Sequence, residues 1–184
     1  KYSDAEGATT CMTSGIGQYV VSPPRYIRID NLPGGVGGHC DGKIINLAEL
    51  TLLKNGAALN MSGTPVVMST FIDANADFGS PEKLVDGNPA TFIHTFFNPP
   101  CDPNPWVYID VGSRSFDQVV VTNRVNDAQN RINGARISFV SDVNGAVPYA
   151  ARQYFPSTSA ATFTFAFPEG SGVLGGSAVS SCPD

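Results

Sequence analysis

The chain has 184 residues, which is long enough for one domain with a sizeable core. Its net charge is −5, only 15% of its residues are charged, and Lys and Arg form no cluster, so neither nucleic acid nor an anionic membrane is an expected partner. No apolar run reaches the roughly 18 residues that span a bilayer, and Lys1 opens no signal peptide. We therefore expect a processed secreted chain or a fragment of a longer one.

The N-terminal third predicts two strands joined by a long loop. An irregular segment, residues 1–22, precedes Arg25–Ile29, where long polar and β-branched residues alternate as in a half-buried strand. Asn31–Gly42 is Gly-rich but lacks the GK[ST] ending of a phosphate-binding loop. The periodicity of Ile44–Lys54 fits either a helix or a strand, and its short flanks favour a strand.

The rest of the chain predicts short strands separated by turns. Pro81–Val85 is expected to be a helical turn, and turn dipeptides follow at Asp86-Gly87 and Asn133-Gly134. The expected strands are Pro65–Ser69, Trp106–Val111, Gln118–Thr122, Ala135–Val140 and Ala161–Phe167. The tail, residues 168–184, is Gly/Ser-rich. With 19 glycines and 14 prolines, this pattern indicates an all-β sandwich.

Four widely scattered cysteines indicate an oxidising compartment. Their number is even and no CxxC pair is present, so two disulfides are favoured over a metal site, with reduced buried cysteines as the alternative. The cysteines are Cys11, Cys40, Cys101 and Cys182. Asn60-Met61-Ser62 is a candidate glycosylation site, which also suggests secretion.

The stretch from Leu84 to Ser141 carries a series of motifs. It contains LVDGNPATFIHT, PWVYIDVG, VVVTNRVNDAQNR and INGARISFVS. Over roughly residues 45–142 this order resembles the fucolectin-type (F-type) lectin domain, a branch of the discoidin-like, galactose-binding-like superfamily. The resemblance implies a β-sandwich or jelly roll of about eight main strands with little helix.

By the same resemblance, His94, Arg124 and Arg131 bind the hydroxyls of a sugar. All three are hydrogen-bond donors, and an Arg fork can bind two adjacent oxygens. Asn126, or Asp127 by a one-residue slip, stands where family members have an Asp before two adjacent cysteines that are absent here. The glycan is therefore expected to be neutral or weakly charged but not specifically fucose, and a His of ordinary pKa would make binding vary near pH about 6–7.

The resemblance also implies a calcium ion that braces the loops around the sugar. A set of oxygen donors suits such a hard cation. The matching residues are Glu49, Ala48, Lys83, Asp86, Asn88 and Thr91, with Ala48, Lys83 and Asn88 contributing backbone carbonyls. Taken from the residues alone, Asp86-Gly87 is an ordinary turn, so both interpretations are open.

The order of the segments suggests a circular permutation. Residues 25–54 resemble the last two strands of a discoidin-like domain but come first in this chain. We expect one sandwich domain over residues 1–184, with both tails brought together. This arrangement implies the pairing Cys11–Cys182, which leaves Cys40–Cys101.

These observations predict an extracellular or cell-surface binding module rather than an enzyme. The chain has no GxSxG or HExxH motif, and its two histidines lack metal-spaced partners. One shallow glycan site would be weak, so useful binding would come from several copies in a multivalent assembly. The alternatives are a structural or adhesive sandwich without an active sugar pocket, tested by whether Phe96 or Phe97 fills the space between His94 and Arg131, and an accessory domain of an enzyme.

Overall fold

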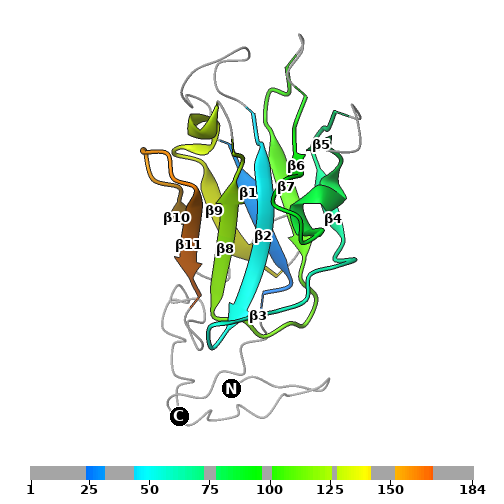
Figure 1. The fold of residues 1–184 in the computed structure, drawn as a ribbon, viewed down its shortest axis with the longest axis vertical. Coiled ribbons are helices and arrows are strands. Elements are labelled where there is room, and N and C mark those ends of the chain that lie inside the picture. Colours follow the sequence, from blue (N-terminus) through cyan, green and yellow to red (C-terminus); the bar gives the residue numbers. More distant parts are fainter. Residues whose placement is uncertain are drawn as a thin grey trace, which may run out of the picture.

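The computed structural model describes residues 24–31, 44–72, 78–96, 101–125, 128–141 and 152–167, which form two antiparallel sheets (Figure 1). The five-stranded sheet contains, in spatial order, β10 (Gln153–Tyr154), β9 (Arg136–Val140), β1 (Tyr26–Asp30), β7 (Trp106–Asp110) and β4 (Val66–Met68). The four-stranded sheet contains β11 (Thr162–Ala166), β8 (Gln118–Asn123), β2 (Leu47–Lys54) and β3 (Ala57–Ala58).

Small elements flank the two sheets. β5 (Phe78–Gly79) and β6 (Phe92–Ile93) form a short parallel pair. The helices of the described residues are two 3₁₀ turns, η1 (Pro81–Val85) and η2 (Gln129–Ile132). Within these residues, no helix has the length and apolar character needed to cross a membrane.

The core lies between the sheets because the strands alternate buried and exposed side chains. In β8 the residues alternate strictly, and Val119 and Val121 are fully buried. Aromatic rings fill one part of the interior, where the ring centroid of Phe139 lies 4.9 Å from that of Phe167, and Phe116 lies 5.2 Å from Phe167. Such packing adds to the hydrophobic burial that holds the two sheets together.

The structure confirms the all-β sandwich and the positions of the expected longer strands. The segment whose periodicity was ambiguous is the strand β2, and the expected helical turn is η1. Seven described strands have at least three residues, close to the eight main strands expected, and the two-residue strands were not anticipated. Strands of two residues form because a neighbouring strand offers hydrogen-bond partners, and they have no sequence pattern of their own.

β1 and β2 hold interior positions in their sheets. β1 lies between β7 and β9, and β2 lies between β8 and β3. The prediction that both segments are strands of this sandwich is confirmed. The circular permutation itself and the extent of the domain stay interpretations.

Candidate functional site

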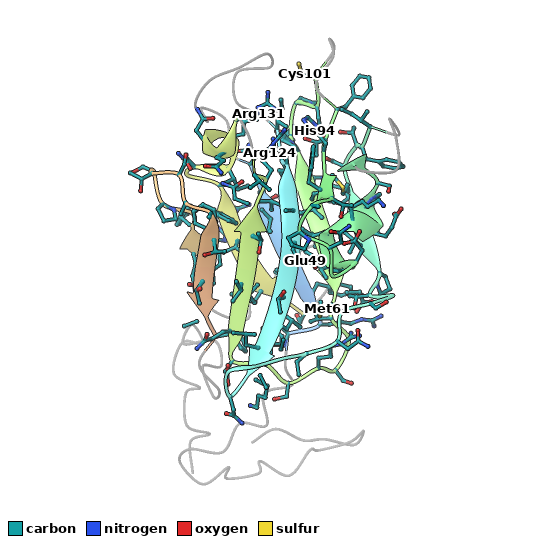
Figure 2. The ribbon with its side chains drawn as sticks, in the orientation of Figure 1. Glu49, Met61, His94, Cys101, Arg124 and Arg131 are labelled. Carbon is teal, nitrogen blue, oxygen red and sulfur yellow. The ribbon has the colours of Figure 1, made fainter. Side chains whose placement is uncertain are left out.

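Two strand ends and a 3₁₀ turn place His94, Arg124 and Arg131 at the same end of the sandwich (Figure 2). His94 directly follows β6, Arg124 follows β8, and Arg131 lies in η2. η2 begins after Ala128, which has a left-handed φ of 75° and reverses the chain after β8. Residues far apart in sequence thus form one polar group, which we call the loop-end cluster.

His94 is held in one tautomer. Its Nδ1 lies 2.6 Å from the carbonyl oxygen of Thr95 and therefore donates, while Nε2 lies 3.3 Å from Arg131 Nη1 and accepts from that guanidinium. Burial lowers the pKa of His94 to about 4, and the charges of Arg131 and Arg124 act in the same direction. His94 is therefore neutral at physiological pH.

The two arginines flank this histidine. Burial lowers the pKa of Arg131, although the group remains charged at any physiological pH. The guanidinium carbon of Arg124 lies 4.5 Å from the ring centroid of Phe92, a cation–π contact, and Phe92 lies 6.3 Å from the His94 ring. The cluster thus presents two cations beside a partly apolar surface.

Buried asparagines hold the backbone that carries the arginines. The Nδ2 of Asn123 donates to the carbonyls of Gln129 and Ala160, and its Oδ1 accepts from the backbone N–H of Arg124. The Nδ2 of Asn31 donates to the carbonyl of Arg131 at 2.9 Å. Both asparagines are almost fully buried, so they fix the loops through hydrogen bonds in a dry environment.

Sequence reasoning missed these supporting residues, and it also missed Asn46. Asn46 is fully buried, and within the described part of the chain neither atom of its side-chain amide has a hydrogen-bond partner. Its neighbour Ile45 exchanges two hydrogen bonds with Thr95, the residue after His94. The available signal was a polar residue within the otherwise apolar run from Ile44 to Leu47, which leads into β2.

The structure corrects one expectation about the loop-end cluster. His94 is only 5% exposed, so its replacement would disturb packing. The expected pH dependence near neutrality is wrong, because the pKa of His94 is lowered to about 4 and its titration lies well below that range. Asn126, Asp127 and Phe97 lie outside the described residues. Phe96 is 37% exposed, and the direct contact between His94 and Arg131 leaves no space for a ring between their nitrogens.

Glu49 and Asp86 meet beside η1. Glu49 Oε2 accepts a hydrogen bond from the N–H of Gly87 at 2.9 Å, and Gly87 adopts a positive φ of 78° that turns this N–H toward β2. Burial first, and the charge of Asp86 second, raise the pKa of Glu49 to about 7. The Glu49 carboxyl is thus partly desolvated beside the exposed carboxylate of Asp86, an arrangement that a cation would relieve.

The turn after η1 brings together four of the six expected ligand residues, namely Glu49, Asp86, Asn88 and Thr91. Asp86 accepts from the Asn88 N–H at 2.9 Å and from the Thr91 hydroxyl at 2.8 Å, and that hydroxyl also lies 2.8 Å from the Asn88 carbonyl oxygen. Ala48 and Lys83 lie nearby, in β2 and η1, two elements that pack against each other. Because a carboxylate oxygen has two lone pairs, these hydrogen bonds leave capacity for a metal. The donor set therefore fits a hard cation.

A cavity of about 460 Å³ adjoins this acidic turn. Its lining includes Glu49, Asp86 and Thr122, together with Asn60 and Ser62 of the glycosylation motif. Asn60 is exposed and forms an Asx turn, in which its Oδ1 accepts from the Ser62 N–H at 2.9 Å. The described residues contain no group of three or more His, Cys, Asp or Glu side chains that would by itself hold a metal.

The fold is a two-sheet β-sandwich, and its similarity to galactose-binding-like domains supports a carbohydrate-binding or structural module. Residues 83–173 match a family model of the F5/F8 type C (discoidin-like) group, described as NedA-like, galactose-binding domain. Over this segment the chain is similar to that family, as its motifs indicated. Neither the curated proteins nor the solved structures contain a match to the chain. Discoidin-like galactose-binding domains are typically binding modules without enzymatic activity.

Proposed function

We propose that this chain is an extracellular lectin-like module that binds a neutral or weakly charged glycan at the loop-end cluster. The observation that carries the proposal is the contact between Arg131 Nη1 and neutral His94 Nε2, with the Arg124 guanidinium above Phe92. A sugar hydroxyl both donates and accepts, so it can bind to such a donor and such an acceptor when it replaces the direct contact between them. The family match to a galactose-binding domain supports this proposal.

The chemistry of each side chain suggests its role. His94 Nε2 is an acceptor because Nδ1 carries the proton that binds the Thr95 carbonyl, and a sugar hydroxyl would take the place of Arg131 Nη1 at this nitrogen. Each guanidinium offers a planar fork that matches two adjacent sugar oxygens. The ring of Phe92 and the stems of the arginines provide apolar surface for the C–H face of the sugar. The arrangement is a set of binding contacts and includes no nucleophile or paired acid and base for catalysis.

Calcium is part of the proposal. Glu49 and Asp86 would hold it with their carboxylates, Thr91 with its side-chain oxygen, and Ala48, Lys83 and Asn88 with backbone carbonyls. Burial and the charge of Asp86 raise the pKa of Glu49, and this supports the proposal that a cation binds beside the two carboxylates. When bound, the ion would link β2 to the turn that leads into β6, and so would brace the strand that His94 follows.

We also propose that the protein is secreted and that it acts in several copies. The even number of cysteines supports an oxidising compartment, with pairs Cys11–Cys182 and Cys40–Cys101, of which only Cys101 lies within the described residues. The exposure of Asn60 agrees with glycosylation at that side chain. Several copies on a surface or in an assembly would compensate for the weakness of one shallow site.

One observation favours a second candidate, a structural or adhesive sandwich. His94 is 5% exposed and already paired with Arg131, as expected of residues that hold loops together. In that case the cluster would contribute to stability and would not bind a sugar.

Binding of galactose and of other neutral sugars to the monomer distinguishes the two candidates. We expect Arg124→Ala and Arg131→Ala to weaken monovalent binding about tenfold or more, because a hydrogen bond to a charged group contributes about 1.5–3 kcal/mol. Arg124→Lys should fail as well, since an ammonium lacks the planar fork. Arg152→Ala, an exposed arginine outside the cluster, is the matched control. Unaltered affinity in both alanine variants, or their unfolding, would contradict the proposed site.

A further inference from the structure

The outer face of the five-stranded sheet contains a separate groove of about 540 Å³, a size typical of small-ligand sites. It lies over the paired strands β1 and β7, beside the edge strand β4, and none of the loop-end residues lines it. The described residues that form it include Tyr26, Arg28, Val67, Trp106, Tyr108 and Asp110. We call it the sheet-face groove.

The groove is aromatic because of strand register. Alternate residues of β1 and β7 point into the core, so Tyr26, Trp106 and Tyr108 share the opposite face. The Trp106 and Tyr108 ring centroids lie 5.2 Å apart, and those of Tyr26 and Tyr108 lie 6.3 Å apart, both edge to face. Tyr26 and Trp106 are half-buried, and Val67 at the rim is 57% exposed. The groove therefore offers ring surface at a fixed place on a rigid sheet.

Charged groups in the groove are held in place by partners. Arg28 donates to Asp30 at 2.6 Å and to the Tyr108 hydroxyl at 2.5 Å, with its guanidinium carbon 4.8 Å from the Tyr108 ring centroid. Asp110 accepts from Arg25 at 2.9 Å and from the Gly112 N–H at 3.0 Å. Among the lining residues one cation, Arg28, balances one anion, Asp110. The lining is thus electroneutral and rich in both donors and acceptors.

We propose that the sheet-face groove is a second carbohydrate site, which binds a neutral saccharide by stacking it on the aromatic rings. A sugar ring has an apolar C–H face for Trp106 and Tyr26, and its hydroxyls can donate to the Asp110 carboxylate and accept from Arg28. The carboxylate disfavours an anionic ligand, and Arg28 disfavours a cation between the rings. A proline-rich peptide would also suit aromatic rings, but proline offers no N–H to the carboxylate.

This site is independent of the loop-end cluster, so either can fail without the other. The groove uses side chains on the outer face of a sheet, whereas the cluster uses strand ends and a 3₁₀ turn. A module with both sites would bind two sugar units at once, and the second contact would raise the overall affinity without any further copy of the chain.

The chain has a single tryptophan, and Trp106 lies in the groove, so its fluorescence reports on this site directly. Emission is recorded while cellotetraose, galactotetraose, chitotetraose or decaproline is added to about 10 mM, which is above the millimolar dissociation constant of a weak site. We expect a saturable change with at least one of the three sugars. It should persist in Arg131→Ala, in which the loop-end cluster is disabled.

Two groove variants and one control complete the test. Tyr26→Ala and Val67→Asp should each weaken the fluorescence-detected affinity tenfold or more, and Val67→Asp alters only an exposed side chain and so should fold. Tyr154→Ala, an exposed tyrosine outside the groove, should leave the affinity unchanged. No emission change with any of the sugars, a change with decaproline alone, or a sugar response lost in Arg131→Ala would each overturn the proposal.

Discussion

The protonation of His94 provides a sharp test of the loop-end geometry. Its folded-state pKa is about 4, against an ordinary value of 6.5, because the ring is buried and lies beside Arg131 and Arg124. Unfolding therefore makes the side chain take up a proton between these two pH values. The folded state is favoured by this group above pH 6.5. That advantage declines as the pH falls and is lost once the folded state is protonated as well.

The size of the effect follows from the shift. A difference of about 2.5 units corresponds to about 3 kcal/mol between pH 7 and pH 4, at about 1.4 kcal/mol per unit. Glu49 has the opposite sign, because a carboxyl with a raised pKa loses stability as the pH rises. The two contributions partly cancel in the parent, so a variant is needed to isolate the histidine.

Urea denaturation of the parent and of His94→Gln at a series of pH values provides that measurement. Glutamine can donate to Thr95 and accept from Arg131 but does not titrate. The free energy of unfolding of the parent, relative to the variant, should fall by about 3 kcal/mol from pH 7 to pH 4. His39→Gln, the other histidine, is the control. A difference that does not change with pH, or an imidazole NMR titration of His94 with an ordinary pKa, would refute the proposed geometry.

Two further predictions concern the metal and the cysteines. Chelation of a calcium-loaded sample should lower the melting temperature, since a ligand at 100 times its dissociation constant stabilises by about 2.7 kcal/mol; Asp86→Ala should abolish this sensitivity, and a parent insensitive to chelator would rule out the ion. Non-reducing peptide mapping should find Cys11–Cys182 and Cys40–Cys101, whereas a Cys11–Cys40 peptide would show that the tails are not joined.

The sequence predicted the sandwich because most of its strands have local signals. β8 has strict alternation, and turn dipeptides mark the ends of several strands. β10 could not be foreseen, because Gln153 and Tyr154 form a strand only by pairing with β9. The groove over β1 and β7 depends on the pairing of residues far apart in sequence, which no local pattern reveals.

The candidate site was predictable in part. The motifs identified His94, Arg124 and Arg131, and the structure brings them to one end of the sandwich. The burial of His94, and with it the lowered pKa, could not be foreseen. Both depend on which segments of the folded chain pack over the ring. The supporting roles of Asn31 and Asn123 likewise arise from long-range packing, since each amide bonds backbone atoms of other segments.

The interior positions of β1 and β2 have a consequence for the order of folding. Arg28 meets Tyr108 across 80 positions of the chain, and Asp30 meets Arg136 across 106. During synthesis, β1 must wait for both of its neighbouring strands, and meanwhile Ile27 and Ile29 have no buried surroundings. Closing loops this long costs conformational entropy before stabilising contacts can form, so the chain should fold slowly. Its exposed apolar strands should make it prone to aggregation during synthesis. Refolding rates and chaperone dependence, rather than equilibrium stability, would then set the yield of this protein.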